Sequence, residues 1–127
     1  MDYIAVEILA GVCLCVTGVS HWLYAEAWCR HFTRLAEQGA EGAFLNGLMH
    51  AGVGALFLAT HPVFTGWHSI LTYWATLLVA KGLLYLLCPT VGLRAMRGCT
   101  PEKAPRLRLI AIPMVALGLV IITIAVL

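Results

Sequence analysis

The sequence predicts an all-α membrane protein, a single domain that crosses the bilayer four times. Hydrophobic residues make up 61% of the 127 residues, charged residues only 11%, and the mean hydropathy is +0.91. An ordinary soluble domain carries about 25% charged residues, so this chain cannot cover an apolar core with a polar surface. Its apolar residues fall into four runs, each long enough to cross a hydrocarbon core of about 30 Å.

The four runs are expected to form two antiparallel hairpins. The predicted spans are residues 3–24, 43–60, 68–87 and 106–127. The first run carries Asp2 and Glu7 and has no basic segment before it, so we expect a retained span and not a cleaved signal peptide. Pro62 and Gly66 between the second and third spans predict a tight turn.

Two polar segments separate the other spans. In residues 25–42, Trp28, Phe32 and Leu35 have the spacing of a short amphipathic helix that lies in the membrane interface. Residues 90–105 are expected to be a basic loop, which follows the stop signal of Pro89.

The basic residues predict the orientation. Seven of the eight lie in or beside these two polar segments: Arg30, Arg34, Arg94, Arg97, Lys103, Arg106 and Arg108. Because short cytoplasmic loops are enriched in lysine and arginine, both termini are expected on the non-cytoplasmic side of the membrane.

A shift of 64 residues superimposes the two halves of the chain without a gap. It places Gly18 on Gly82 and Gly54 on Gly118, and spans coincide with spans. The pattern predicts a parallel repeat of a two-helix unit; the alternative is chance identity between segments that share a topology.

The segment Gly18–Trp28, followed by a polar loop and a glycine-rich span, resembles the YjeT-like family of short bacterial inner-membrane proteins. That family has a glycine, a tyrosine-proline turn and a tryptophan after its first span. Here Ala25 stands for the proline, while the second half keeps Pro89 but has Cys88 and Gly92 for the tyrosine and tryptophan. The resemblance implies a location in the bacterial inner membrane and no assigned chemistry.

Small residues predict where helices pack closely. Gly47, Ala51 and Gly54 share one helical face, and such residues let two backbones approach each other in a membrane. The other glycines predicted to serve packing in this way are Gly11, Gly18, Gly82 and Gly118.

Polar side chains inside the spans are the candidate functional residues, because burying them in a bilayer is costly. His21, His50 and Lys81 are predicted at similar depth, with Asn46 one turn from His50, so they are candidates for one polar layer near the cytoplasmic face. Glu7 is expected toward the opposite face, too far from Lys81 for a direct ion pair.

Each candidate also has a structural alternative. Lys81 can extend its stem toward the interface, His50 can bond to a backbone carbonyl, and Glu7 can be hydrated near the membrane boundary. His61 and His68, beside the short turn, are expected to be surface residues.

The leading functional interpretation is an accessory or structural membrane subunit that packs with itself or with a larger membrane complex. The sequence has no phosphate loop, nucleophile–base pair or dinucleotide fingerprint, which argues against an enzyme. The five cysteines have no metal-site spacing, and the net charge of +2 gives no reason to expect nucleic acid.

Two alternatives remain open. His21 and His50 could ligate haem b, or hold another pigment or a quinone, from neighbouring helices. Lys81 and Glu7 could instead serve a small oligomeric transporter or channel.

Overall fold

The computed structural model describes residues 2–127 and is helical throughout apart from short connections. Four long apolar helices could each cross a membrane: α1 (Tyr3–Leu23), α3 (Ala40–Thr60), α4 (Ser69–Leu87) and α6 (Ala104–Val126). Shorter elements connect them: α2 (Ala25–Glu37), α5 (Pro89–Arg97) and the 3₁₀ turn η1 (Pro101–Lys103). The predicted all-α, four-span fold class is confirmed, and the chain is a membrane-integral protein.

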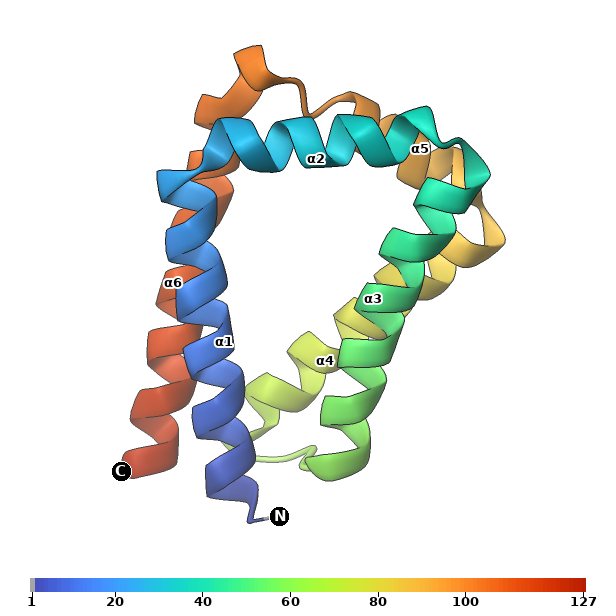
Figure 1. Cartoon of the computed structure of the whole chain (residues 1–127). Helices are drawn as coiled ribbons and strands as arrows, with labels where there is room; N and C mark the ends of the chain where they lie inside the picture. Colours follow the sequence, from blue (N-terminus) through green and yellow to red (C-terminus); the bar gives the residue numbers. More distant parts are fainter. Residues whose placement is uncertain (1) are drawn as a thin grey trace.

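The long helices form two antiparallel pairs (Figure 1). Helix α3 packs against α4, to which a short turn connects it. Helix α1 packs against α6, which lies at the other end of the chain. The first span therefore takes the last span as its partner, not its neighbour in sequence. The end of the molecule that holds the α3–α4 turn and both termini is called the link end, and the opposite end the basic end.

The two pairs meet at the link end. There Val6 and Ala10 of α1, Phe57 of α3, and Leu71 and Ala75 of α4 are buried in one apolar core. Toward the basic end the pairs diverge, and α2 crosses from one pair to the other (Figure 1). The molecule is thus closed by packed side chains at one end and by short helices at the other.

Helix boundaries recur at the 64-residue offset. Helices α1 and α4 end at Leu23 and Leu87, and α3 and α6 begin at Ala40 and Ala104. Each half of the chain contributes one helix to each pair. The two pairs are therefore equivalent under the same shift.

Glycine contacts show this equivalence in detail. A Cβ on Gly118 would lie 2.7 Å from the carbonyl oxygen of Gly11, and a Cβ on Gly54 would lie 2.6 Å from that of Ala75. The shift of 64 converts the first contact into the second. Further along the seams, Gly18 faces Ala111, and the residues equivalent to these two, Gly82 and Gly47, face each other as well, with Ala51 beside Gly82. Small side chains at these positions bring the backbones together.

The polar segments fold into helices at the basic end. Helix α2 is strongly amphipathic, and Gly39, with φ of 68°, turns the chain from α2 into α3. The basic segment after α4, expected to be a loop, forms α5. Pro89 both ends α4 and begins α5, because a helix does not need the N–H of its first residue.

Candidate functional site

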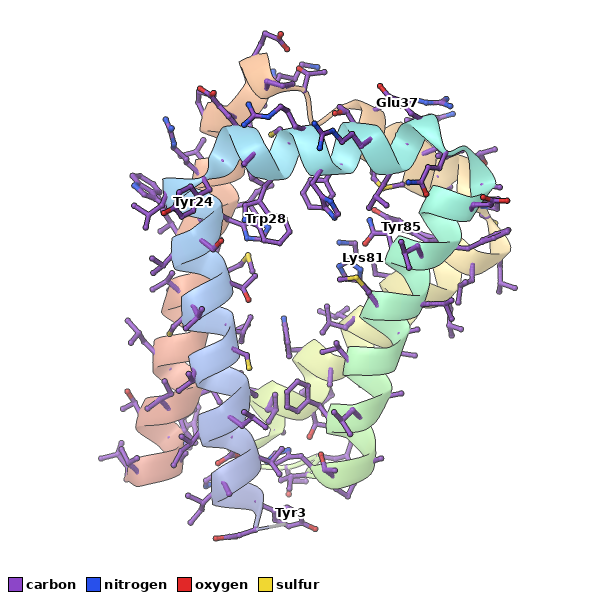
Figure 2. The ribbon with its side chains drawn as sticks, in the orientation of Figure 1. Tyr3, Tyr24, Trp28, Glu37, Lys81 and Tyr85 are labelled. Carbon is purple, nitrogen blue, oxygen red and sulfur yellow. The ribbon has the colours of Figure 1, made fainter. Side chains whose placement is uncertain are left out.

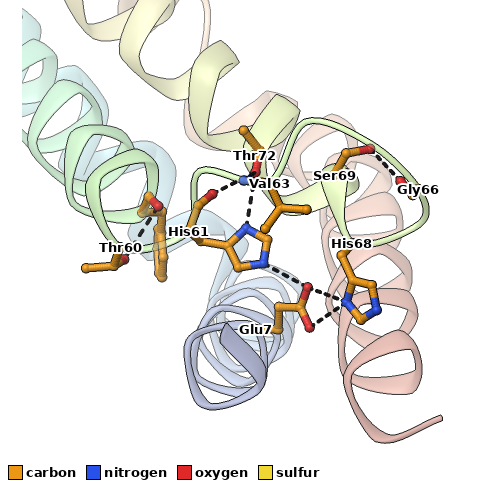
Figure 3. Close-up of polar contacts among 9 residues, drawn as sticks. Glu7, Thr60, His61, Val63, Gly66, His68, Ser69 and Thr72 are labelled. Atoms are coloured by element: carbon orange, nitrogen blue, oxygen red, sulfur yellow. Dashed lines mark hydrogen bonds and ion pairs between the residues drawn. The ribbon is translucent and has the colours of Figure 1, made fainter. Parts of the chain in front are cut away.

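A buried carboxylate with two histidines closes the link end (Figure 3). His61 Nε2 lies 2.9 Å from Glu7 Oε1, and His68 Nδ1 lies 2.8 Å from the same oxygen and 3.1 Å from Oε2. Thr72 completes the Glu7 cluster from α4, with its Oγ1 3.1 Å from His61 Nδ1. Since Glu7 belongs to α1, this cluster ties one helix pair to the turn of the other.

Burial separates the two histidines. Glu7 is 1% exposed and His61 0%, whereas the side chain of His68 is 50% exposed. The expectation that Glu7 is hydrated was therefore wrong, as was the surface placement of His61. The apolar core of Val6, Phe57 and Leu71 lies at this end of α1, and His61 and His68 cover the carboxylate itself. The surface placement of His68 is confirmed.

Sequence reasoning did not predict the Glu7 cluster, because Glu7 and His61 are 54 residues apart. One signal was present. The link end carries a carboxylate inside a span and two histidines, with no lysine or arginine to pair with it.

A second cluster lies in the part of the molecule where the pairs diverge. Lys81 Nζ of α4 is 3.0 Å from His50 Nε2 of α3, and His50 Nδ1 is 2.9 Å from the carbonyl oxygen of Asn46. A carbonyl only accepts, so His50 Nδ1 carries the proton and Nε2 accepts from the ammonium. Lys81 also lies 5.6 Å from the centre of the Tyr85 ring. These four residues form the Lys81 cluster.

The lysine is not extended along the helix to the interface. Lys81 lies six residues before the end of α4, about 9 Å at 1.5 Å per residue. Its ammonium stays at about the membrane depth of its own backbone. His50 and Lys81 are next in sequence to Ala51 and Gly82, which touch each other across the α3–α4 pair, so the contact between their side chains also runs across the pair. Figure 2 shows Lys81 and Trp28 directed toward the space between the two pairs from opposite sides.

The Lys81 cluster is anchored to a short helix at the basic end. Buried Asn46 donates from Nδ2 to the sulfur of Met96 in α5, at 3.3 Å. The Asn46 side chain therefore ties α3 to α5 one helical turn from His50.

His21 lies outside this cluster. Its Nδ1 is 2.7 Å from the carbonyl oxygen of Thr17, and its ring stacks on Trp28 with centroids 4.3 Å apart. His21 and His50 belong to different helix pairs, and Lys81 already occupies the outward nitrogen of His50. The residues present do not fit two axial ligands of one haem, so the geometry does not favour the haem hypothesis.

The two polar clusters are also separate from each other. The apolar core of Leu14, Phe57 and Ala75 lies between them, and Glu7 and Lys81 form no ion pair in the described chain. Within residues 2–127 no chain of polar contacts joins them, so the geometry does not favour a transport path either.

Two thiols meet at the basic end. Cys29 Sγ of α2 lies 2.9 Å from Cys99 Sγ, in the segment between α5 and η1. Burial, followed by the hydrogen bond and the charge repulsion from Cys29, raises the pKa of Cys99 to about 12. The Cys99 sulfur is therefore protonated at neutral pH.

No family model, curated protein or solved structure matches this chain. Within residues 2–127, no group of three histidine, cysteine or carboxylate side chains is arranged to hold a metal ion. The candidate functional residues are those of the Glu7 and Lys81 clusters.

Proposed function

We propose that this protein is an accessory binding component of the bacterial inner membrane, with both termini on the non-cytoplasmic side, and that Lys81 binds the anionic head group of a lipid-like molecule. The observation that carries the proposal is the contact between the Lys81 ammonium and a neutral acceptor, His50 Nε2, inside a membrane span. A protonated amine in that position attracts a negative charge.

The charge around Lys81 supports an anionic ligand. No carboxylate of residues 2–127 lies within ion-pair distance of its Nζ. The imidazole of His50 offers only a lone pair, and the Tyr85 ring offers only the weak attraction of its face. The cation is therefore balanced by dipoles, and a phosphate or carboxylate would complete the site.

The surroundings favour a ligand that enters from the bilayer. Lys81 is exposed, and the neighbouring Leu77 and Leu84 are exposed on the same helix. A ligand beside them must be apolar along most of its length. Trp28 faces this space from α2 (Figure 2), and tryptophan is common where head groups meet acyl chains.

Lipid retention tests the proposal. The protein is reconstituted in vesicles of equal parts phosphatidylglycerol and phosphatidylcholine, extracted in mild detergent and weighed by native mass spectrometry. Wild type and Lys81→Arg are expected to retain phosphatidylglycerol preferentially. Lys81→Met is expected to bind it about 10- to 100-fold more weakly, since a charge-assisted hydrogen bond contributes about 1.5–3 kcal/mol.

Lys103→Met is the matched control, because it removes an exposed lysine at the basic end by the same chemical change. Equal retention by the Lys81→Met and Lys103→Met variants would contradict the proposal. If a protein subunit co-purifies with wild type and is lost with Lys81→Met, the cation serves a partner's carboxylate instead of a lipid.

A further inference from the structure

We infer that Glu7, His61 and His68 form a proton-binding site, which holds one proton between Glu7 and His61 at neutral pH and exchanges it with water through His68. The inference is independent of the Lys81 cluster, from which the apolar core separates it.

The buried Glu7 carboxylate has no lysine or arginine side chain to balance its charge. Glu7 and His61 are almost completely buried, and the eight lysines and arginines of the chain all lie away from the link end. An ionised Glu7 beside two neutral histidines would leave a net negative charge in a medium of low dielectric constant. Buried charges of this kind are costly unless they are neutralised. With no lysine or arginine at this end, a proton on the cluster is the charge that neutralises the Glu7 carboxylate.

The hydrogen bonds of Thr72 indicate which nitrogen of His61 carries a proton. Thr72 Oγ1 donates to the carbonyl oxygen of His61 at 2.8 Å, so it has no second hydrogen to give. It accepts from the backbone N–H of Val63, 3.2 Å away, and it can accept from His61 Nδ1 as well. His61 Nδ1 is therefore the protonated nitrogen, and Nε2 is left facing Glu7 Oε1.

Two states satisfy this arrangement. Either His61 is an imidazolium beside a Glu7 carboxylate, or it is a neutral imidazole that accepts a hydrogen bond from a Glu7 carboxylic acid. The pair has no net charge in both states, and the same proton lies between the same two atoms. The proton between His61 Nε2 and Glu7 Oε1 is absent only if the Thr72 hydroxyl donates to His61 Nδ1 instead of accepting from it.

His68 supplies the route to water. Its Nδ1 donates to both oxygens of Glu7, while half of its side chain is exposed. The other groups facing the site are the Tyr3 ring, edge-on to His61, and the hydroxyl of Thr72. Among residues 2–127, the remaining charged side chain at this end is that of Asp2, and α3 and α6 contribute none there.

Histidine NMR tests the inference. The full chain, with ¹⁵N-labelled histidine, is studied in nanodiscs at pH 7, and resonances are assigned with His61→Gln and His68→Gln. The expected result is a protonated His61 Nδ1, accompanied either by a protonated Nε2 or by an infrared carboxylic-acid band that Glu7→Gln removes. An unprotonated His61 Nδ1, with no such band, would overturn the inference.

Exchange with deuterium gives a second measurement that does not depend on the folding of a Glu7 variant. His68→Gln changes a half-exposed residue, and it is expected to slow exchange at His61 at least tenfold while leaving the proton in place. His31→Gln changes an exposed histidine of α2, at the other end of the molecule, and is expected to leave both results unchanged. An unchanged exchange rate in the His68→Gln protein would refute the proposed route.

Discussion

The α1–α6 and α3–α4 pairs have the same seam but different chemistry. Gly118 against Gly11 in one pair corresponds to Gly54 against Ala75 in the other. The residues that match Lys81 and His50, however, are Thr17 and Met114, and the residue that matches Glu7 is Leu71. The backbone contacts follow the repeat, and the ionisable side chains within the spans depart from it.

This difference separates structural residues from candidate functional ones. Small residues at equivalent positions are needed by both pairs, because each pair must bring two backbones together. A lysine inside one pair contributes nothing that the other pair needs for packing. We therefore expect substitutions at equivalent seam positions to change the stability of the protein by similar amounts. Substitutions in the polar clusters should have effects that substitutions at the equivalent positions of the other pair do not have.

The largest loss of stability is expected at Glu7, the buried residue that differs most from its equivalent in the other pair. Glu7 and Leu71 are each 1% exposed and occupy equivalent places, but only Glu7 has ionic partners. Glu7→Ala should lower the free energy of unfolding by about 3–5 kcal/mol, since it leaves His61 buried without its hydrogen-bond partner. Steric trapping in bicelles at pH 7 measures the change. A loss below about 1 kcal/mol would show that the Glu7 cluster contributes little to the fold.

The seam glycines test the similarity of the pairs. Gly54→Ala and Gly118→Ala each place a Cβ within 2.7 Å of a backbone carbonyl oxygen on the facing helix. We expect both to lower the free energy of unfolding by a similar amount, about 1–3 kcal/mol, because the helices must separate.

Gly52→Ala is the control for this comparison, as a Cβ there meets nothing within 4 Å. It should leave stability unchanged or raise it slightly, since alanine favours a helix. A large loss at only one of Gly54 and Gly118 would contradict the equivalence of the seams.

The four spans and the glycine-rich faces could be predicted because they depend on local sequence. Hydropathy indicates a span, and a spacing of three and four residues places Gly47, Ala51 and Gly54 on one face. The pairing of α1 with α6 could not be predicted in this way, since all four helices have similar composition. The shift of 64 does not select it either, because pairing α1 with α3 and α4 with α6 would also give equivalent helices equivalent partners.

The polar clusters could be predicted only in part. The rise per residue of a helix predicted that His50 and Lys81 lie at a similar depth in the membrane, and the two side chains are in contact. His21 was predicted in the same layer, but its ring stacks on Trp28 because α2 folds back over the end of α1. Contacts of this kind depend on where a loop places its side chains, which periodicity does not describe.

The coupling between Lys81 and His50 is expected to be smaller. Lys81→Thr and His50→Met give the α3–α4 pair the residues of the other pair. A double-mutant cycle should yield a coupling energy of about 0.5–1.5 kcal/mol, the usual contribution of one hydrogen bond. Thermal unfolding of the four proteins in the same detergent provides the values. Strictly additive effects would mean that the contact has no energetic weight.

The smallest effect on stability, and a clear effect on reactivity, is expected at the thiol pair. The positions that match Cys29 and Cys99 are Leu93 and Leu35, which pack in an apolar cluster at the basic end. The pKa of Cys99 is raised from 9.0 to about 12, so its thiolate fraction at neutral pH is roughly a thousandfold lower than ordinary. Maleimide labelling should be much slower at Cys99 than at exposed Cys88, and should accelerate about tenfold per pH unit from 7 to 10.

Cys29→Ser sharpens this test, because Cys29 contributes to the raised pKa both as a hydrogen-bond partner and as a neighbouring charge. Labelling of Cys99 at pH 8 should become faster in this variant, while labelling of Cys88 should not change. Burial is the larger cause of the shift and remains, so Cys99 should still react more slowly than Cys88. An identical Cys99 rate in wild type and Cys29→Ser would mean that burial alone controls this thiol, and that the sulfur contact, which replaces a leucine contact of the other half, has no effect on its reactivity.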